Sequence, residues 1–221
     1  MGTNPNGFPR RIEANMQAAY TWEYGGAGRD VTENGKTGTL QGNAATSEGV
    51  LTLDGTGDYV STPPPWAANP ASMTITGWVK SEDIAATRMA YTVKETNTTN
   101  GRGLRVFLRS ATGKLRFDTF DAEVGTRAIT ETTTSIVQSV WYFYSVTHAS
   151  GTTKIYLDGV EEAETTGEAL YTHNYDEARV GGWEVVGFGW SGTIGETRIY
   201  NRSITAAEVQ TIFNDTRGDY I

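Results

Sequence analysis

The sequence predicts an all-β protein that ends in one short helix. Short runs rich in β-branched and aromatic residues recur along the chain, Gly, Asn and Asp separate them, and several separations have tight-turn chemistry. This pattern is typical of a sandwich or a barrel. A chain of 221 residues suits one large domain of this class, and we find no internal repeat and no second domain.

The strands are expected where β-formers cluster between turn residues. Their ranges, in chain order, are 18–22, 50–53, 58–61, 73–80, 89–94, 104–109, 114–119, 141–148, 153–157, 160–165, 178–180 and 192–200.

Three junctions between these strands predict hairpins. Asp158-Gly159 separates two predicted strands by two residues, and Ser150-Gly151 and Thr112-Gly113 lie in two further junctions. A type I′ turn needs positive φ at both central positions, which Asp followed by Gly tolerates. The connections between these strands are therefore expected to be short and antiparallel.

The helix signal follows the last strand. Thr205 and Glu208 have the spacing of a capping box, in which each side chain satisfies the other residue's backbone N–H. Val209, Ile212 and Phe213 then form one apolar face. We expect this helix to pack on the edge of the sandwich and to close it.

The first residues differ in character from the rest. Residues 1–15 are polar and rich in Asn, Pro and Gly, so we expect an extended N-terminal arm before a domain of residues 16–221. Such a segment does not order alone, and a partner subunit is expected to hold it. The arm residues expected in that contact are Phe8, Arg10, Arg11 and Ile12. The arm therefore predicts an oligomer or a component of a larger assembly.

Composition excludes several classes of partner. The net charge of −8 and pI near 4.8 argue against nucleic-acid binding, which needs clustered Lys and Arg. The chain has no cysteine, so it has neither disulfides nor thiolate metal sites. No apolar run is long enough to span a membrane, and the first residues contain no apolar signal core.

Five blocks of the sequence occur in the order found in a known family. They are RDVTENGKTGTLQG (29–42), LTLDGTGDYV (51–60), MTITGWVK (73–80), WYFYSVTHASGTTKIYLDGVE (141–161) and GTIGETRIYNRSITAAEV (192–209). With them the chain resembles the laminin-G-like branch of the concanavalin A-like lectin and glucanase superfamily. The resemblance implies a jelly-roll β-sandwich of two antiparallel sheets with a concave face. It also implies that the last long strand pairs near the first.

Catalysis is not expected. Glycosidases of this superfamily carry closely spaced carboxylates on one strand, because the reaction needs two of them at a fixed separation. We find no such pattern. The acidic residues Asp158, Glu161, Glu162 and Glu164 are expected at the surface, and His148 and His173 lack a local partner for general base chemistry. A glucanase or lyase activity would need groups brought together from distant strands.

The resemblance also implies a structural calcium ion near the chain ends. At the matching positions Asp30 and Asn34 supply oxygen atoms, which calcium prefers. Gly195 stands where the family has an aspartate, and Glu196 follows it. One residue along a strand reverses the face, so Glu196 takes the aspartate's role only if a bulge turns it. Otherwise Asp30 is a turn residue.

Glycan sites combine aromatic platforms with a few polar groups. The glycine-rich loop 181–192 carries Trp183, Phe188 and Trp190, and Tyr175 lies shortly before it. We expect these rings to form a carbohydrate surface. The alternative is that they cap the core, because large aromatic residues dominate cores. Trp78 and Trp141, which lie in apolar strands, are expected in the core.

Two functional hypotheses follow. The first is a non-catalytic display or structural module of a large assembly, such as a phage capsid decoration or fibre-type protein on a virion surface, which also adheres to glycans. The second is a carbohydrate-binding lectin module of an extracellular protein. Exposed rings at Trp183 and Trp190 would favour the lectin, and buried rings the structural module.

Overall fold

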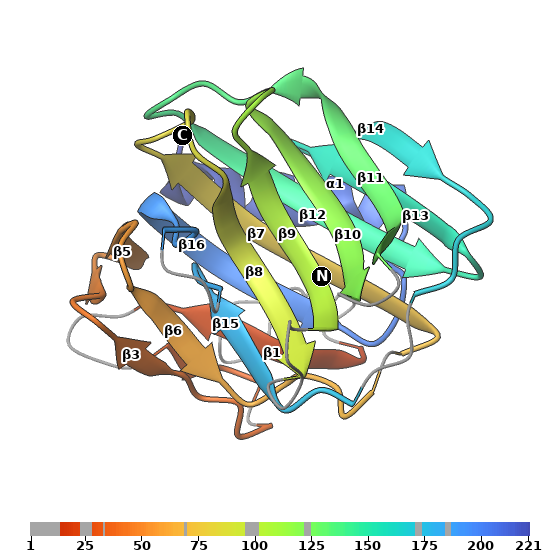
Figure 1. The fold of residues 1–221 in the computed structure, drawn as a ribbon, viewed down its shortest axis with the longest axis horizontal. Coiled ribbons are helices and arrows are strands. Elements are labelled where there is room, and N and C mark those ends of the chain that lie inside the picture. Colours follow the sequence, from red (N-terminus) through yellow and green to blue (C-terminus); the bar gives the residue numbers. More distant parts are fainter. Residues whose placement is uncertain are drawn as a thin grey trace.

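The protein is a two-layer β-sandwich with a helix on one outer face (Figure 1). The computed structural model describes residues 14–22, 28–32, 34–68, 70–95, 102–121, 125–170, 174–183 and 187–221. All strand pairings within the two sheets are antiparallel, which confirms the jelly-roll expectation. In Figure 1, β8, β9 and β10 of one sheet lie in front of β7 and β12 of the other.

The front layer is a seven-stranded sheet. Its strands, in spatial order, are β11 (Gly125–Ser135), β10 (Lys114–Asp121), β9 (Arg102–Arg109), β8 (Arg88–Glu95), β15 (Glu177–Val180), β6 (Tyr59–Thr62) and β3 (Thr39–Gln41).

The second layer is a nine-stranded sheet. Its main path contains β14 (Val160–Thr165), β13 (Thr152–Leu157), β12 (Trp141–Ala149), β7 (Ser72–Ser81), β16 (Ser191–Tyr200), β1 (Met16–Thr21) and β2 (Arg29–Asp30). Two further strands, β5 (Val50–Asp54) and β4 (Ala45–Ser47), branch from β16.

Strand β16 joins these parts. One edge pairs with β7, and the other pairs first with β5 and then with β1. The register on β7 shifts between Ile194 and Thr197, at the point where β16 changes partners. The Asn201 amide donates to the Asn15 carbonyl at 3.0 Å, so the start and the end of the domain meet. This confirms the expected pairing of the last long strand near the first.

The expected hairpins form. Asp158 and Gly159 have φ of 49° and 81°, and Ser150 and Gly151 have φ of 51° and 76°, as type I′ turns require. The third hairpin needs positive φ only at Gly113 (φ 65°), because its connection is longer. The Asp158 carboxylate also accepts from the Phe143 amide at 2.8 Å, which ties the turn to β12.

Four strands were missed from the sequence: β2, β3, β4 and β11. The first three have two or three residues each, too few to show a period. Strand β11 is long, but its sequence GTRAITETTTS contains one aliphatic β-branched residue and no aromatic residue. Thr130 and Thr132 are buried there, so their β-branched side chains fill inward positions.

The main core fills the space between the sheets. Inward residues of both layers contribute, among them Leu104, Val106 and Phe117 from the front sheet and Ile75 and Val146 from the other. Trp66 of the proline-rich loop also packs there. This burial of apolar surface provides the main driving force for the sandwich.

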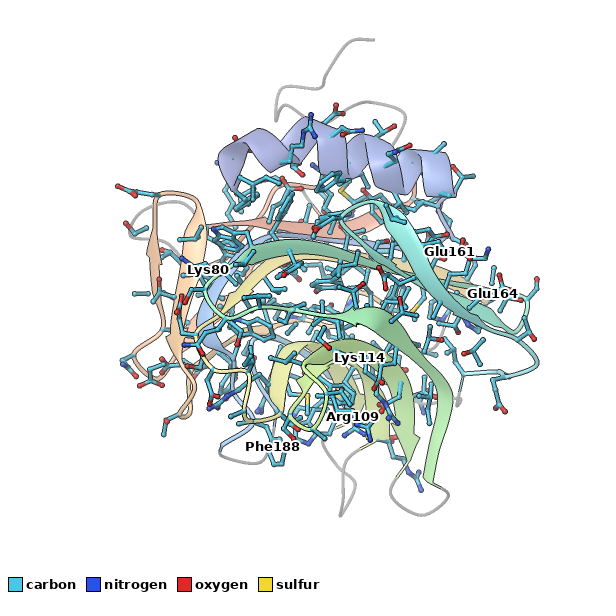
Figure 2. The ribbon with its side chains drawn as sticks, turned by 90° about the horizontal axis from the view of Figure 1, so that it is seen from above. Lys80, Arg109, Lys114, Glu161, Glu164 and Phe188 are labelled. Atoms are coloured by element: carbon cyan, nitrogen blue, oxygen red, sulfur yellow. The ribbon has the colours of Figure 1, made fainter. Side chains whose placement is uncertain are left out.

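The helix α1 (Ala206–Thr216) has the expected capping box at Thr205 and Glu208 and continues into the short 3-10 helix η1 (Arg217–Asp219). Its position differs from the prediction. It does not close an edge; it covers the outer face of the nine-stranded sheet (Figure 2). Trp78 and Trp141 contact this layer and not the main core, because Trp78 stacks on Tyr220 at 4.6 Å between ring centroids. Within the described residues, no helix has the length and hydrophobicity that a membrane crossing needs.

Candidate functional site

One sheet face remains uncovered by the helix: the outward face of the seven-stranded sheet, here called the outer face. Strand alternation sends Leu104, Val106 and Leu108 into the core, so their neighbours Arg105, Phe107 and Arg109 point outward. Figure 2 shows Arg109 and Phe188 on the side of the molecule away from the helix. Thr92, Lys94 and Asp118 on this face are at most 1% exposed, whereas Arg109 keeps 42% of its side-chain surface.

Polar side chains form a continuous row across this face. Asp118 is paired in register with Arg105, Arg105 with Thr92, Thr92 with Arg179, and Arg179 with Ser61. Directly opposed residues on adjacent strands point to the same side. The row therefore crosses β10, β9, β8, β15 and β6 and brings together residues that are distant in sequence.

The first part of the row is the Asp118 cluster, formed by Asp118, Arg105 and Arg116. Arg105 binds the Asp118 carboxylate with two hydrogen bonds, from Nε at 2.6 Å and from an Nη at 3.2 Å. Arg116 Nε lies 3.4 Å from the same carboxylate. The Asp118 side chain is only 1% exposed, whereas the two arginines keep 18% and 19% of their side-chain surface.

The second part is the Glu177 cluster, formed by Glu177, Lys94 and Arg179. Lys94 Nζ lies 3.0 Å from the Glu177 carboxylate, and Arg179 donates two hydrogen bonds to it at 2.8 and 3.1 Å. Burial raises the pKa of Glu177, but the hydrogen bonds from Arg179 and Lys94 outweigh that effect and lower it below its ordinary value. Glu177 is therefore a fixed anion at neutral pH.

Aromatic rings lie among these charges. The half-buried Trp183 ring faces the Arg105 guanidinium at 5.9 Å, and the Trp183 carbonyl accepts from Arg179 at 2.8 Å. Arg179 also stacks over the Tyr59 ring at 4.2 Å. Cation–π contacts of this kind orient both partners. The segment after β15 thus holds Trp183 between the two charge clusters.

The absence of a side chain at Gly182 allows the segment that carries Trp183 to lie directly against the sheet. Its carbonyl accepts from Thr92 at 3.0 Å, and a Cβ at this position would lie 2.5 Å from Tyr59 Cβ. Any other residue would push the loop away from the sheet, because that distance is far inside van der Waals contact. The glycine-rich composition of the loop therefore serves close approach to the outer face.

The four expected glycan residues have different environments. Trp183 lies on the outer face, and Phe188, 36% exposed, follows β15 beside the start of β8. The expectation is wrong for Trp190 and Tyr175, whose rings are buried in the main core at 0% and 5% exposure. Trp190 fills the core and donates to the Lys80 carbonyl at 3.1 Å, so its indole N–H is satisfied away from solvent.

The expected calcium residues are not brought together. The Asp30 carboxylate accepts hydrogen bonds from the amides of Ala19, Thr32 and Lys36 and from the Thr32 hydroxyl. The Asn34 side-chain amide donates to the Met16 and Gln17 carbonyls. Asp30 therefore organises the turn after β2, and its oxygen atoms are occupied by N–H and O–H groups.

Glu196 lies elsewhere, at the register shift in β16. It forms an ion pair with Arg198 and lines a cavity of about 400 Å³ beside Trp22 and Tyr220. Glu48 and Asp219 also line this cavity, but Asp30 does not. Within the described parts of the chain, no three His, Asp or Glu side chains are grouped as metal ligands would be. The expected bulge is present, yet it turns Glu196 toward Arg198.

The groups set aside as non-catalytic have structural partners. His148 is buried and lies 2.8 Å from the Thr153 hydroxyl, and burial lowers its pKa. Glu162 accepts from the backbone and side chains of Thr133 and Thr134, which fastens β14 to β11. Lys154 pairs with Glu161 and Glu164.

Several expected residues lie outside the described part of the chain. These are His173 and the arm residues Phe8, Arg10, Arg11 and Ile12. The described chain begins at Ala14, whose carbonyl accepts from Arg202 at 2.9 Å.

A model of the Concanavalin A-like lectin/glucanases superfamily, of laminin G type, matches residues 54–210, more than half of the chain. The chain belongs to this superfamily. No relative was found among curated protein sequences.

Solved structures share the fold at low sequence identity. Domain 4 of AbnA, an extracellular GH43 arabinanase from Geobacillus stearothermophilus, in complex with arabinotriose, aligns with a TM-score of 0.72 at 18% identity over 90% of this chain and 98% of that chain. Trypanosoma rangeli sialidase aligns with a TM-score of 0.72 at 15% identity over 94% of this chain but 33% of its own length. The receptor binding domain of botulinum neurotoxin C/D mosaic serotype gives 0.69 at 16% identity, over 92% and 52%.

Replacement of Glu177 by Gln tests the charge network. At pH 7 we expect the unfolding free energy to fall by about 3 kcal/mol, because the buried Lys94 loses its ion pair with Glu177. The pKa of Glu177 is lower in the folded than in the unfolded protein, so this stability is present above pH 4.5 and is lost as pH falls through the folded-state value. Urea unfolding at several pH values should show the wild-type advantage shrinking below pH 4.5.

Glu131→Gln is the matched control, since Glu131 pairs with the more exposed Arg109 at 3.2 Å. We expect a small loss of unfolding free energy there, because the ion pair is more exposed. A constant difference between wild type and Glu177→Gln from pH 7 to pH 3 would contradict the assignment.

Proposed function

We propose that this protein is a non-catalytic carbohydrate-binding module whose ligand lies on the outer face. The observation that carries the proposal is Trp183, a half-buried ring held between the Asp118 and Glu177 clusters by contacts to Arg105 and Arg179. Sugar sites combine such a ring with fixed polar groups around it. The ring and these groups are ordered before a ligand arrives, which lowers the entropic cost of binding.

The state of the carboxylates supports binding and not hydrolysis. A glycosidase needs a protonated acid of raised pKa beside a second carboxylate. On the outer face Asp118 and Glu131 are paired with arginines, and the pKa of Glu177 is lowered. The lowered pKa keeps Glu177 as an anion, so Glu177 does not supply the protonated acid that hydrolysis needs. The binding domains among the structural neighbours are consistent with this proposal.

A glycan microarray, followed by calorimetric titration of the best ligand, tests the proposal. We expect Trp183→Ala to weaken binding at least about tenfold, because stacking and the orientation of Arg105 are lost together. Trp141→Ala, on the helix-covered side, should leave the affinity unchanged. The proposal fails if the folded wild-type protein binds no carbohydrate, or if the two variants weaken binding equally.

The wider context we propose is display on a large assembly, such as a virion, with the N-terminal arm contacting another subunit. Support comes from the polar composition of residues 1–13. The carbonyls of Ala14 and Asn15, which follow them, accept hydrogen bonds from Arg202 and Asn201 and so attach this part of the chain to the domain.

Light scattering of the full chain and of a chain that begins at Ala14 tests this second proposal. This cut keeps the contacts to Arg202 and Asn201, so the domain should stay folded. We expect a defined oligomer for the full chain and a monomer for the shortened one. Equal masses, with or without glycan, would count against the assembly role and leave carbohydrate binding untouched.

A further inference from the structure

We infer that Phe188 forms a second aromatic platform of the carbohydrate site, and that the protein therefore selects a chain of sugars long enough to contact both Trp183 and Phe188. This inference rests on the proposed carbohydrate binding and names the class of ligand, an oligosaccharide. It is carried by the exposure of Phe188, by the hydrogen bonds that fix its backbone and by its distance from Trp183.

Phe188 is exposed although the same loop buries another ring. Among the aromatic side chains that the structure describes, none is more exposed than Phe188, at 36%. Trp190 follows two residues later and is fully buried in the main core. A Cβ on Gly187 would meet no described atom within 4 Å, so the space beside Phe188 is open. An apolar ring left in water gives up the free energy of burial, which a ligand stacked on the ring recovers.

The backbone around Phe188 is held at three successive carbonyl groups. Arg88 donates from one Nη to the Gly187 carbonyl at 3.3 Å and to the Gly189 carbonyl at 3.1 Å. The Met89 amide donates to the Phe188 carbonyl at 2.9 Å. Single exposed apolar residues are common, but this ring is presented from a segment that is ordered before a ligand arrives, which lowers the entropic cost of binding.

Trp183 is held in the same way on the other limb of the loop. Its carbonyl accepts from Arg179 at 2.8 Å, and the Gly181 amide donates to the Ala90 carbonyl of β8 at 2.9 Å. The two limbs are joined where the Trp190 amide donates to the Gly181 carbonyl at 2.8 Å. Both rings therefore belong to one loop, and the seven-stranded sheet fixes each limb.

The two rings are attached at separate points along β8. On the Trp183 limb the Gly182 carbonyl accepts from Thr92, and on the Phe188 limb the contact is to Met89. Thr92 and Met89 are three residues apart, which corresponds to roughly 10 Å along a strand. Groups in contact lie within about 4.5 Å of each other. A single sugar stacked on Trp183 therefore does not reach Phe188, whereas a chain of sugars contacts both rings.

A polar group is available at the Phe188 end of the outer face. Met89, which binds the Phe188 carbonyl, is paired in register with Phe107 on β9. Arg109 points to the same side of β9 two residues later, and it keeps 42% of its side-chain surface while it pairs with Glu131. Figure 2 shows Arg109 and Phe188 on the side of the molecule away from the helix. Sugar sites combine a ring with polar groups of this kind.

The experiment measures how affinity depends on ligand length. The probes are cello-, xylo-, manno- and malto-oligosaccharides of one to six sugars, and the strongest microarray ligand shortened one sugar at a time. Calorimetric titration is applied to the full chain, Phe188→Ala, Phe188→Tyr as a conservative variant, and Val137→Ala as a control. Val137 is 57% exposed and lies in the connection between β11 and β12. The hydrogen bonds of Phe188 come from its backbone, so Phe188→Ala keeps them and should fold.

We expect affinity to rise with ligand length, so that the longest oligomers bind about tenfold or more tightly than the shortest ligand that binds. Phe188→Ala should weaken the binding of the long oligomers roughly fivefold, the loss of one aromatic contact, and leave the shortest ligand unaffected. Phe188→Tyr and Val137→Ala should bind as wild type. Trp183→Ala should weaken binding at every length.

The inference is overturned if affinity does not depend on length, if Phe188→Ala leaves the long oligomers unaffected or weakens short and long ligands equally, or if Val137→Ala has the same effect. In each of these cases the proposed carbohydrate function survives, provided that Trp183→Ala still weakens binding. If no carbohydrate binds in these titrations or on the microarray, the function and the inference fail together.

Discussion

Strand alternation in β8, β9 and β10 is the constraint on which the rest of the structure depends. Every second residue of these strands enters a dry core, so the residues between them cannot avoid the outer face. Those residues are largely charged, and the backbone spacing places them within hydrogen-bonding reach of one another. Arg105 therefore binds Asp118 across the strand pair, and the outward side chains organise into clusters instead of extending singly into water.

The helix gives the two sheets different roles. Trp78, Phe213 and Tyr220 stack between α1, η1 and the nine-stranded sheet, and Trp78 donates to the Thr216 hydroxyl at 2.9 Å. This second apolar layer covers the side of the nine-stranded sheet that faces away from the main core. The seven-stranded sheet keeps its charged face, and the segment after β15 adds Trp183 to it. The packing of the helix thus determines which of the two sheets has its outward side covered by an apolar layer.

Much of the architecture could be predicted from the sequence, because its signals are local. The Asp158-Gly159 turn and the Thr205–Glu208 box are each fixed by a few adjacent residues. The site could not be predicted in this way. Glu177 lies beside Lys94 only because β15 pairs with β8. The periodicity of apolar residues within each strand does not predict which strands pair. One local signal is present: Arg alternates with apolar residues in RGLRVFLR, which predicts a strand with one charged face but not the partners of its arginines.

Two errors have a common physical cause. Glycine-rich loops usually indicate exposed rings, yet Trp190 turns into the core because a large ring fills the space between the sheets. Likewise, Asp30 has a carboxylate that could bind a metal ion, but the turn after β2 places the Thr32 and Lys36 amides around it as hydrogen-bond donors. The position of each side chain is therefore set by its local surroundings: Trp190 fills apolar space between the sheets, and Asp30 accepts hydrogen bonds from nearby amides.

The most direct test of the central claim is an NMR titration of the ¹⁵N-labelled protein with the tightest-binding glycan. Arginine side-chain Nε–Hε signals report on the clusters without disturbing them. The account predicts saturable shifts at Arg105, Arg116 and Arg179 and at the Trp183 indole, with the signals of Arg202 and the Trp78 indole unchanged. Shifts confined to the helix-covered side, or to the cavity beside Glu196, would contradict it.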